Sequence, residues 1–325
     1  MLRRTIAVAA IAASVIPVAL AKHTLTGAVR IDGSSTVYPI TEAVAEEFHG
    51  VERKVRVSVG FSGTGGGFKK FAAGETQISD ASRPIKAKER QSLDSAGINF
   101  IELPVAYDGL CVVLNTKNTW VDYLTVDELK MIFLDGSTVT KWSDVRPGWP
   151  DVAVDIYAPG TDSGTFDYFK EVVAGKKGSI RGDMQVSEDD NILVRGVSGS
   201  TGAIGFFGYA YYVENASKLR AVPIDGGNGP VMPTSTTVEN GTYSPFSRPL
   251  FIYVSAEAAD EPQVAAFVDF YLDNGAELAS EVGYVGLPKD IQMKIRRIWN
   301  TRETGTRFLT SSGEKVHKPL TALYR

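Results

Sequence analysis

The chain has 325 residues, of which 43% are hydrophobic and 22% are charged, and this length can accommodate two domains. These fractions are typical of a soluble globular protein and exclude the collagen-like, disordered and disulfide-framework classes. The net charge of −4 and the lack of a basic stripe in the sequence argue against a nucleic-acid partner.

The N-terminus has the three parts of a secretory signal peptide. Arg3 and Arg4 form a positive region, residues 6–18 form a short apolar region, and residues 19–21 (Ala-Leu-Ala) match a cleavage site. The apolar region is shorter than the roughly 20 residues that a membrane-spanning helix needs, which disfavours a retained anchor. We therefore expect residues 1–21 to be removed. Because no cysteine directly follows the cleavage site, we expect no lipid anchor and a mature chain that is free in a Gram-negative periplasm.

The first half of the chain alternates predicted strands and helices, separated by turns rich in glycine and serine. The predicted elements are a strand at 29–31, a helix at 40–48, a strand at 55–59, helices at 68–73 and 86–93, and strands at 98–103 and 110–115. The single cysteine, Cys111, lies in the last of these strands, where a buried thiol is its expected role.

The second half repeats this alternation. Thr125 and Glu128 have the spacing of a capping box, which predicts the start of a helix. The predicted elements are a helix at 125–133, a strand at 152–157, a helix at 166–173, strands at 202–209 and 249–254, helices at 264–272 and 291–299, and an irregular polar tail from 301. Strands that alternate with helices predict an α/β protein with a mostly parallel sheet.

Four of the turns between a strand and a helix carry hydroxyl side chains and glycine. The first N–H groups of a helix have no partner within the helix, and the helix dipole makes the potential there positive. Such N–H groups, together with Ser and Thr hydroxyls, can bind a tetrahedral oxyanion at the carboxyl edge of a sheet. The four turns contain Ser34-Ser35-Thr36, Ser62 with Thr64, Ser82 with Arg83, and Ser163-Gly164-Thr165.

Each turn taken alone also has a simpler interpretation. Ser and Thr before a helix are common N-caps that contribute ~1 kcal/mol to stability. Arg83 could form a surface salt bridge, or its guanidinium could bind two oxygens of an anion at roughly 1.5–3 kcal/mol. The glycines at 63–67 lack the Lys-Ser/Thr ending of a P-loop and the spacing of a dinucleotide-binding motif. The recurrence of the pattern in both halves of the chain favours an anion site.

Five stretches together carry a resemblance to a known family. They are 32–39 (DGSSTVYP), 63–68 (GTGGGF), 79–85 (SDASRPI), 160–166 (GTDSGTF) and 202–205 (GAIG). On these stretches the chain resembles the periplasmic phosphate-binding protein of the high-affinity phosphate ABC transporter (PstS type), a type 2 periplasmic binding protein. The resemblance extends over about residues 29–300 and is closest to the branch with a Ser-Arg-Pro turn.

The resemblance implies a fold of two α/β lobes joined by crossover strands, with the anion dehydrated in a cleft on which the lobes close. It implies a discontinuous first lobe of residues 25–107 and 249–325, and a second lobe of residues 108–248. It also implies a binding protein for inorganic phosphate, a monomer that needs no cofactor or metal and whose closed form docks onto a membrane permease.

The family's ligand positions can be carried over onto the matching residues of this chain. Ser35 and Thr36 match the donors at the first helix, and Ser62 or Thr64 match those at the second. Ser163-Gly164-Thr165 matches the hydroxyl and backbone donors of the second lobe.

Two positions depart from the better-known branch of the family. That branch has an arginine just before its Ser-Gly-Thr turn, where this chain has Pro159 and Gly160, so Arg83 is the candidate replacement. It also has an aspartate where Ser82 falls, and that aspartate accepts the proton of hydrogen phosphate, which sulfate lacks. Selectivity for phosphate therefore requires another carboxylate.

Three aspartates are candidates for this acceptor. Asp108 opens an apolar strand near the expected crossover and is the favoured one, although it could also be a turn residue before Gly109. Asp80 and Asp162 are better explained as local turn and cap residues. The full set of predicted ligands is Ser35, Thr36, Ser62, Thr64, Ser82, Arg83, Asp108, Ser163, Gly164 and Thr165.

Three alternatives to a phosphate receptor remain open. The same fold could bind sulfate, molybdate or tungstate, which need only hydrogen-bond donors. An exported phosphomonoesterase is disfavoured, because His23, His49 and His317 form no cluster with metal-ligand spacing and no nucleophile elbow follows a strand. A surface adhesion protein with a vestigial pocket is the third alternative.

Overall fold

The computed structural model of the protein describes residues 25–161, 163–175, 177–187 and 189–324. The predicted signal peptide (1–21) and Asp162 lie outside the described residues. Among the helices within these ranges, none combines the length and apolarity that crossing a bilayer requires.

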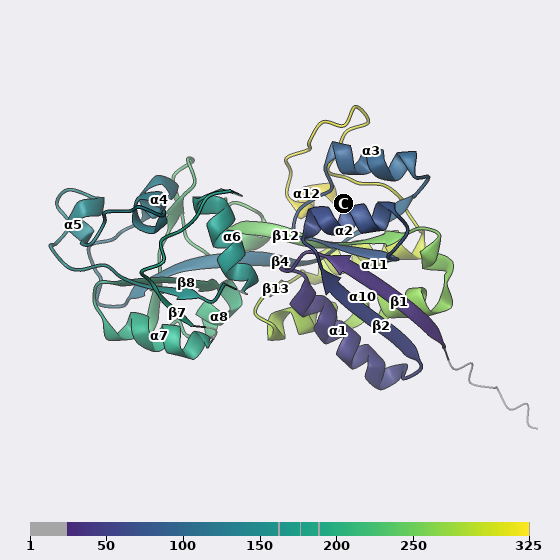
Figure 1. Ribbon diagram of the computed structural model, residues 1–325, viewed down its shortest axis with the longest axis horizontal. Coiled ribbons are helices and arrows are strands. Elements are labelled where there is room, and N and C mark those ends of the chain that lie inside the picture. The colour runs from purple at the N-terminus through teal and green to yellow at the C-terminus, as the bar shows by residue number, and fades with distance from the viewer. Residues whose placement is uncertain (1–24, 162, 176, 188, 325) are drawn as a thin grey trace, which may run out of the picture.

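The protein consists of two α/β lobes, which Figure 1 shows side by side. Strands and helices that precede the first crossover are β1 (Gly27–Gly33), α1 (Tyr38–Val51), β2 (Val55–Phe61), α2 (Thr64–Ala72), β3 (Ile78–Ala81) and α3 (Ala87–Ser95). The middle of the chain forms β5 (Leu124–Thr125), α4 (Val126–Phe133), α5 (Trp142–Val145), β6 (Asp155–Pro159), α6 (Gly164–Val173), β7 (Gln185–Ser187), α7 (Asp190–Gly199), β8 (Ala203–Gly208), α8 (Tyr209–Glu214), β9 (Leu219–Ala221), β10 (Ile224–Asp225), β11 (Pro230–Val231) and α9 (Ser235–Glu239).

Two strands, β4 (Phe100–Asn115) and β12 (Ser247–Ser255), run between the lobes (Figure 1). They pair with each other antiparallel, with Asp108 opposite Arg248. The predicted boundaries at 107/108 and 248/249 fall within these two strands. The chain then adds η1 (Ala258–Asp260), α10 (Pro262–Glu281), β13 (Val285–Gly286), α11 (Lys289–Asn300) and α12 (Leu320–Leu323).

The described strands form one ten-stranded sheet, in the order β2-β1-β3-β12-β4-β8-β6-β7 with β13 and β9 also paired to β4, and a separate three-stranded sheet. Parallel pairing occurs within each lobe, between β1 and its neighbours β2 and β3 and between β6 and its neighbours β7 and β8. The pairs of β4 and β12 with their neighbours are antiparallel. Within each lobe, the strands that alternate with helices are parallel, as the sequence predicted, and the joined sheet is mixed because the crossover strands β4 and β12 pair antiparallel with their neighbours.

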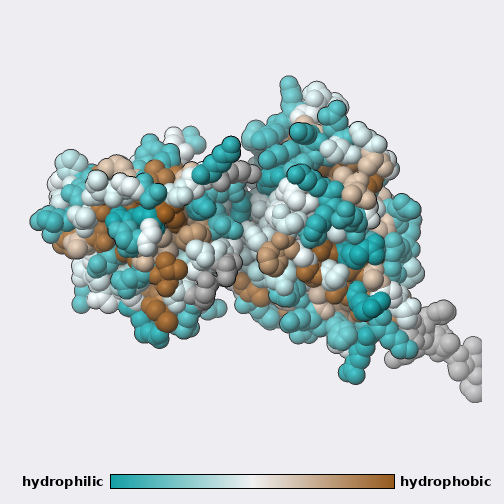
Figure 2. All heavy atoms as spheres, in the orientation of Figure 1, coloured by the Kyte–Doolittle hydropathy of each residue, from teal (hydrophilic) through white to brown (hydrophobic). Residues whose placement is uncertain are grey.

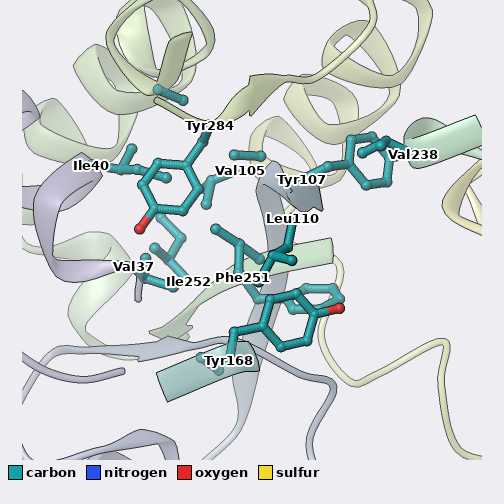
Figure 3. Packing of buried hydrophobic residues seen from close by; sticks show 14 of the residues in the cluster. Val37, Ile40, Val105, Tyr107, Leu110, Tyr168, Val238, Phe251, Ile252 and Tyr284 are labelled. Atoms are coloured by element: carbon teal, nitrogen blue, oxygen red, sulfur yellow. The ribbon is translucent and has the colours of Figure 1, made fainter. Parts of the chain in front are cut away.

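Strand β4 joins two runs that the sequence predicts as separate strands. All of its residues are buried, since other elements cover both faces, and Cys111 is among them, as predicted. The polar side chains Glu102 and Asp108 lie inside it, so Asp108 stands in the middle of a strand and not in a turn. Figure 3 shows the core around this crossover, with Val37 from the turn before α1, Leu110 from β4 and Tyr168 from α6, all members of one hydrophobic cluster.

The helix start predicted at Thr125 is confirmed. The Thr125 hydroxyl accepts a hydrogen bond from the N–H of Glu128 at 3.1 Å, and the Glu128 carboxylate accepts from the N–H of Thr125 at 2.9 Å. This reciprocal pair satisfies two N–H groups that a helix start leaves without partners.

The C-terminal tail after residue 301 is largely irregular, as predicted, but it is anchored to the core. The buried Glu102 carboxylate accepts hydrogen bonds from the N–H of Arg307 and the hydroxyl of Tyr324, both at 3.0 Å, and from the hydroxyl of Thr306. Tyr253 on β12 donates to the same carboxylate at 3.0 Å. One buried acid therefore holds both ends of the tail against the sheet.

Candidate anion-binding cleft

The turn between β1 and α1 lies at the junction of the two lobes. The N–H of Ser34 donates to the carbonyl of Asp80 at 3.0 Å, and the Ser34 hydroxyl accepts from the N–H of Thr36 at 3.2 Å. Ser34 thereby folds the turn, and α1 starts after it at Tyr38. Ser35 is half-buried and Thr36 is buried.

The second and third turns meet each other. Thr64, the first residue of α2, has its hydroxyl 3.2 Å from the Ser82 hydroxyl and accepts a hydrogen bond from the N–H of Ser82 at 3.2 Å. Ser62, by contrast, donates its hydroxyl to the carboxylate of Asp32, which also forms an ion pair with Lys70 at 2.6 Å.

The second lobe contributes the start of α6. Ser163 caps this ten-residue helix, with its hydroxyl accepting from the N–H of Thr165 at 3.2 Å. A Cβ atom placed on Gly164 would lie 3.2 Å from the Cα atom of Thr36 and 3.5 Å from the hydroxyl oxygen of Tyr284. The helix N-terminus of one lobe therefore touches the turn of the other lobe at this glycine.

An ion pair between the two crossover strands lies beside this contact. Arg248 on β12 places its Nη2 atom 3.0 Å from Oδ2 of Asp108 on β4, and the same Nη2 donates to the Thr36 hydroxyl at 3.2 Å. The guanidinium carbon is 3.6 Å from the ring centre of Tyr168 on α6, and Glu171 is 3.9 Å from Nη1. Arg248 thus contacts both lobes.

The electrostatics of this pair follow from its burial. Burial raises the pKa of Asp108, and the charge of Arg248 offsets part of that rise. Burial also raises the pKa of Tyr284, and the negative charge of Asp108 adds to the effect. Tyr284 therefore keeps its proton and offers an O–H group, and Asp108 binds a proton more readily than an exposed aspartate does.

Two cavities flank the contact between Thr36 and Gly164. The Asp108 cavity, of about 630 Å³, is lined by Ser35, Asp108, Ser163-Gly164-Thr165 and Tyr284 among others. The Arg248 cavity, of about 920 Å³, is lined by residues that include Ser34, Ser35, Thr36, Thr64, Ser82, Arg83, Tyr168, Glu171 and Arg248. Ser35 lines both, so the two cavities form the sides of one cleft, and Figure 2 shows that the surface is hollowed between the lobes.

Comparison with known proteins agrees with this architecture. Residues 20–274 match the family model described as PBP superfamily domain. The chain belongs to the PBP superfamily. "Protein SphX" of Synechocystis sp. is 48% identical over 291 residues, which are 89% of this chain and 86% of that protein. "Phosphate-binding protein PstS" of Staphylococcus saprophyticus is 41% identical over 265 residues, 81% of either chain.

A solved structure of another PBP superfamily member is similar along most of the chain. The crystal structure of "a possible phosphate binding protein" from Planctomyces limnophilus is 48% identical, covers 86% of this chain and 99% of its own, and has a TM-score of 0.83. Together with the sequence relatives it confirms the resemblance to the PstS-type proteins and the two-lobe α/β fold.

Within this PBP fold, nine of the ten predicted ligands line the cleft. Ser35, Asp108 and Ser163-Gly164-Thr165 line the Asp108 cavity, and Thr36, Thr64, Ser82 and Arg83 line the Arg248 cavity. Ser62 lines neither cavity and is bonded to Asp32. Asp80, the alternative acceptor, is fully buried beneath the turn and does not line the cleft.

Arg83 lines the cleft, but its guanidinium is already paired. Its two terminal nitrogens donate to the two oxygens of Glu89 at 2.8 and 2.6 Å. Burial alone would raise the pKa of Glu89, but this ion pair holds it below its usual value. Glu89 also accepts from the N–H of Lys86 at the start of α3, so Arg83 helps to hold that helix.

Sequence reasoning missed Arg248 and Tyr284. Arg248 could have been found by the argument that singled out Asp108, because it is a charged residue at the start of an otherwise apolar strand near the crossover. Tyr284 had no local signal, since it follows a helix in a segment without a motif. Within the described ranges, no group of three or more His, Cys, Asp or Glu side chains could hold a metal ion.

Proposed function

We propose that the protein is the receptor of an ABC importer for inorganic phosphate, exported to the periplasm and active as a monomer. The observation that carries this proposal is the Arg248–Asp108 pair, which lies at 3.0 Å where donor-rich turns of both lobes meet. It combines one fixed positive charge with one buried acceptor, and hydroxyl and N–H donors of both lobes lie beside it. The printed names of the PstS and Planctomyces limnophilus proteins support the same ligand.

The donors of the cleft replace the hydration shell of the anion. Hydroxyls of Ser35 and Thr36 come from the first lobe, and the N–H groups at the start of α6 come from the second. Arg248 forms charge-assisted hydrogen bonds with two oxygens of the ligand, each of roughly 1.5–3 kcal/mol. The positive end of the α6 dipole adds to the attraction for a negative ligand.

Asp108 provides the selectivity against sulfate. Hydrogen phosphate carries a proton that it can donate to the Asp108 carboxylate, whereas sulfate has no proton at neutral pH and would place two acceptors against each other. Because Asp108 is 3% exposed, such an unsatisfied contact would not be relieved by water. The raised pKa of Asp108 strengthens this hydrogen bond, since it makes the carboxylate a better proton acceptor.

The lobes close on the anion, and a membrane permease recognises the closed form. The contact between Gly164 and Thr36 is one of the points at which the lobes touch, so a ligand bound beside it links the two lobes directly. The role requires no turnover, and we propose binding without catalysis.

Isothermal titration calorimetry of the purified protein with phosphate and with sulfate tests this function. We expect micromolar or tighter binding of one phosphate and no competition by sulfate. The variant Asp108→Asn should bind phosphate more weakly and gain affinity for sulfate, because an amide can donate to a fully deprotonated oxyanion. Absence of phosphate binding, equal binding of sulfate or molybdate, or hydrolysis of p-nitrophenyl phosphate would contradict the proposal.

A further inference from the structure

A third cavity lies next to the cleft, on the side where the C-terminal tail crosses. This cavity, which we call the tail cavity, has a volume of about 500 Å³ and is lined by residues that include Tyr107, Val238, Phe308, Lys315, Lys318 and Leu320. Its volume is within the range of small-molecule sites. The tail that closes it lies beyond residues 20–274, which match the PBP superfamily, and is held in place by the bonds to Glu102.

The tail cavity contains an unsatisfied hydrogen-bonding group. The side chain of Tyr107 on β4 is 2% exposed and lies beside Val238 (Figure 3). Its hydroxyl has no hydrogen-bond partner among the described residues. Burial, together with the negative charge of Glu239, raises the pKa of Tyr107, so the hydroxyl keeps its proton. A buried O–H donor without an acceptor destabilises the protein. A ligand oxygen that accepts this hydrogen bond would remove the penalty and so favour binding.

The rest of the lining is apolar inside and positively charged outside. Phe308, Val238 and Leu320 are buried and form an apolar wall. Lys315 and Lys318 are exposed at the solvent side, whereas the charge of Arg83 is already balanced by Glu89. Lys86 and the acid Glu239 also line the cavity. Charge complementarity therefore favours a negatively charged ligand over a neutral or cationic one.

We propose that the tail cavity binds a small organic anion with an apolar, ring-sized body. The negative group of this ligand lies at Lys315 and Lys318, the body packs against Val238 and Phe308, and an oxygen of the body accepts a hydrogen bond from the Tyr107 hydroxyl. An inorganic anion such as phosphate does not suit this site, because it has no apolar surface to cover the wall.

Binding at the tail cavity is coupled to the cleft, and this part rests on the proposed phosphate function. Tyr107 lies on a crossover strand, Val238 belongs to the segment between the crossovers, and Phe308 belongs to the tail. Because a ligand there bridges walls from these three parts of the chain, the proposal includes that it favours the arrangement in which Gly164 lies against Thr36. Phosphate is proposed to favour the same arrangement, so each ligand raises the affinity for the other by the same factor.

Titration of the purified protein with hydroxynaphthoate and naphthoate, which differ by one hydroxyl group, tests the site. We expect saturable binding of one equivalent of each, with hydroxynaphthoate roughly threefold to tenfold tighter. Tyr107→Phe removes only the hydroxyl and should abolish this difference while leaving naphthoate affinity unchanged. The double variant Lys315→Ala/Lys318→Ala should weaken both ligands, whereas the exposed control Lys54→Ala should weaken neither.

Phosphate binding is measured on the same samples, so that failure of the tail-cavity proposal can be distinguished from failure of the phosphate-receptor proposal. Binding of phosphate without saturable binding of either naphthoate would overturn the tail-cavity site and leave the phosphate receptor intact. Hydroxynaphthoate binding that is unchanged in both the Tyr107 and the lysine variants would overturn the assignment to this cavity. An affinity for hydroxynaphthoate that saturating phosphate leaves unchanged would overturn the coupling.

Discussion

Two arginines line the cleft, and they differ in what their guanidinium groups contact. Both terminal nitrogens of the Arg83 guanidinium are bonded to Glu89, so an anion would have to replace an existing ion pair. Arg248 pairs with Asp108 at 3.0 Å, donates to the hydroxyl of Thr36 and lies over the ring of Tyr168, and its Nη1 atom has only the more distant Glu171 carboxylate at 3.9 Å. Arg248 can therefore add ligand oxygens without losing a partner that holds the fold.

We predict that Arg248→Ala lowers phosphate affinity far more than Arg83→Ala. Loss of a charge-assisted contact of roughly 1.5–3 kcal/mol corresponds to an increase in Kd of at least about tenfold. Arg83→Ala should change Kd by less than about threefold and should mainly reduce stability, through the loss of the pair with Glu89. Calorimetry and thermal unfolding of both variants separate the two effects. A larger loss of affinity in Arg83→Ala would restore Arg83 as the binding arginine.

A second prediction concerns Asp80, which is fully buried at the end of β3. Burial raises the pKa of Asp80 from 3.8 to about 7, the Thr41 side chain offsets part of this rise, and the negative charge of Asp32 adds to it. The folded protein thus holds this proton more tightly than the unfolded chain. Protonation of Asp80 therefore stabilises the folded state fully below about pH 4. As the pH rises to about 7, this contribution to the free energy of unfolding falls by up to about 1.4 kcal/mol per pH unit.

Asp80→Asn should remove this contribution. Denaturant unfolding at a series of pH values should show the variant gaining stability relative to the wild type between about pH 4 and 7. Asp94→Asn, at an exposed aspartate, controls for the loss of one carboxylate. A difference between wild type and Asp80→Asn that does not vary with pH would contradict the assignment.

At the scale of elements, local sequence patterns predicted a helix correctly where the residues of that segment alone determine its structure. The Thr125 capping box and the apolar periodicity of α6 and α11 are such cases. Two predicted runs merged into β4, because burial on both faces removes the alternation that marks a strand boundary. The tail had no periodic pattern, and its position depends on Glu102, about two hundred residues earlier in the chain.

We predict that Glu102→Ala releases the tail. The substitution leaves the donors of Tyr253, Thr306, Arg307 and Tyr324 without their acceptor, which should lower the free energy of unfolding by roughly 2–4 kcal/mol. Limited proteolysis should then cleave after residue 301 in the folded variant.

Glu303→Ala is the matched control for this experiment. It removes an exposed ion pair with Arg307, so it should cost less than about 1 kcal/mol and leave the tail resistant to protease. Equal resistance of Glu102→Ala and the control would show that other contacts hold the tail.

At the scale of the whole molecule, function depends on how the lobes meet. Gly164→Ala places a methyl group 3.2 Å from the Cα atom of Thr36, so the lobes must stay slightly apart. We predict a loss of phosphate affinity of about tenfold with an unchanged or slightly higher Tm without ligand, because alanine favours helix α6. Calorimetry and thermal unfolding check both parts.

Gly50→Ala, near the end of α1, provides the control, since a Cβ atom there has no neighbour within 4 Å. It should leave phosphate affinity at the wild-type value. If Gly164→Ala also binds phosphate as the wild type does, the contact with Thr36 is not part of closure.

The sequence by itself determined the α/β class, the turns that carry hydrogen-bond donors and the order of those turns along the chain. Each depends on residues a few positions apart, through periodicity, capping and turn chemistry. Only the tertiary structure decided which charges meet. Arg248 reaches Asp108 across 140 positions and Thr36 across 212, and those contacts exist because β4 and β12 pair where the lobes join. No local pattern encodes such a pairing, since it results from the packing of the whole sheet.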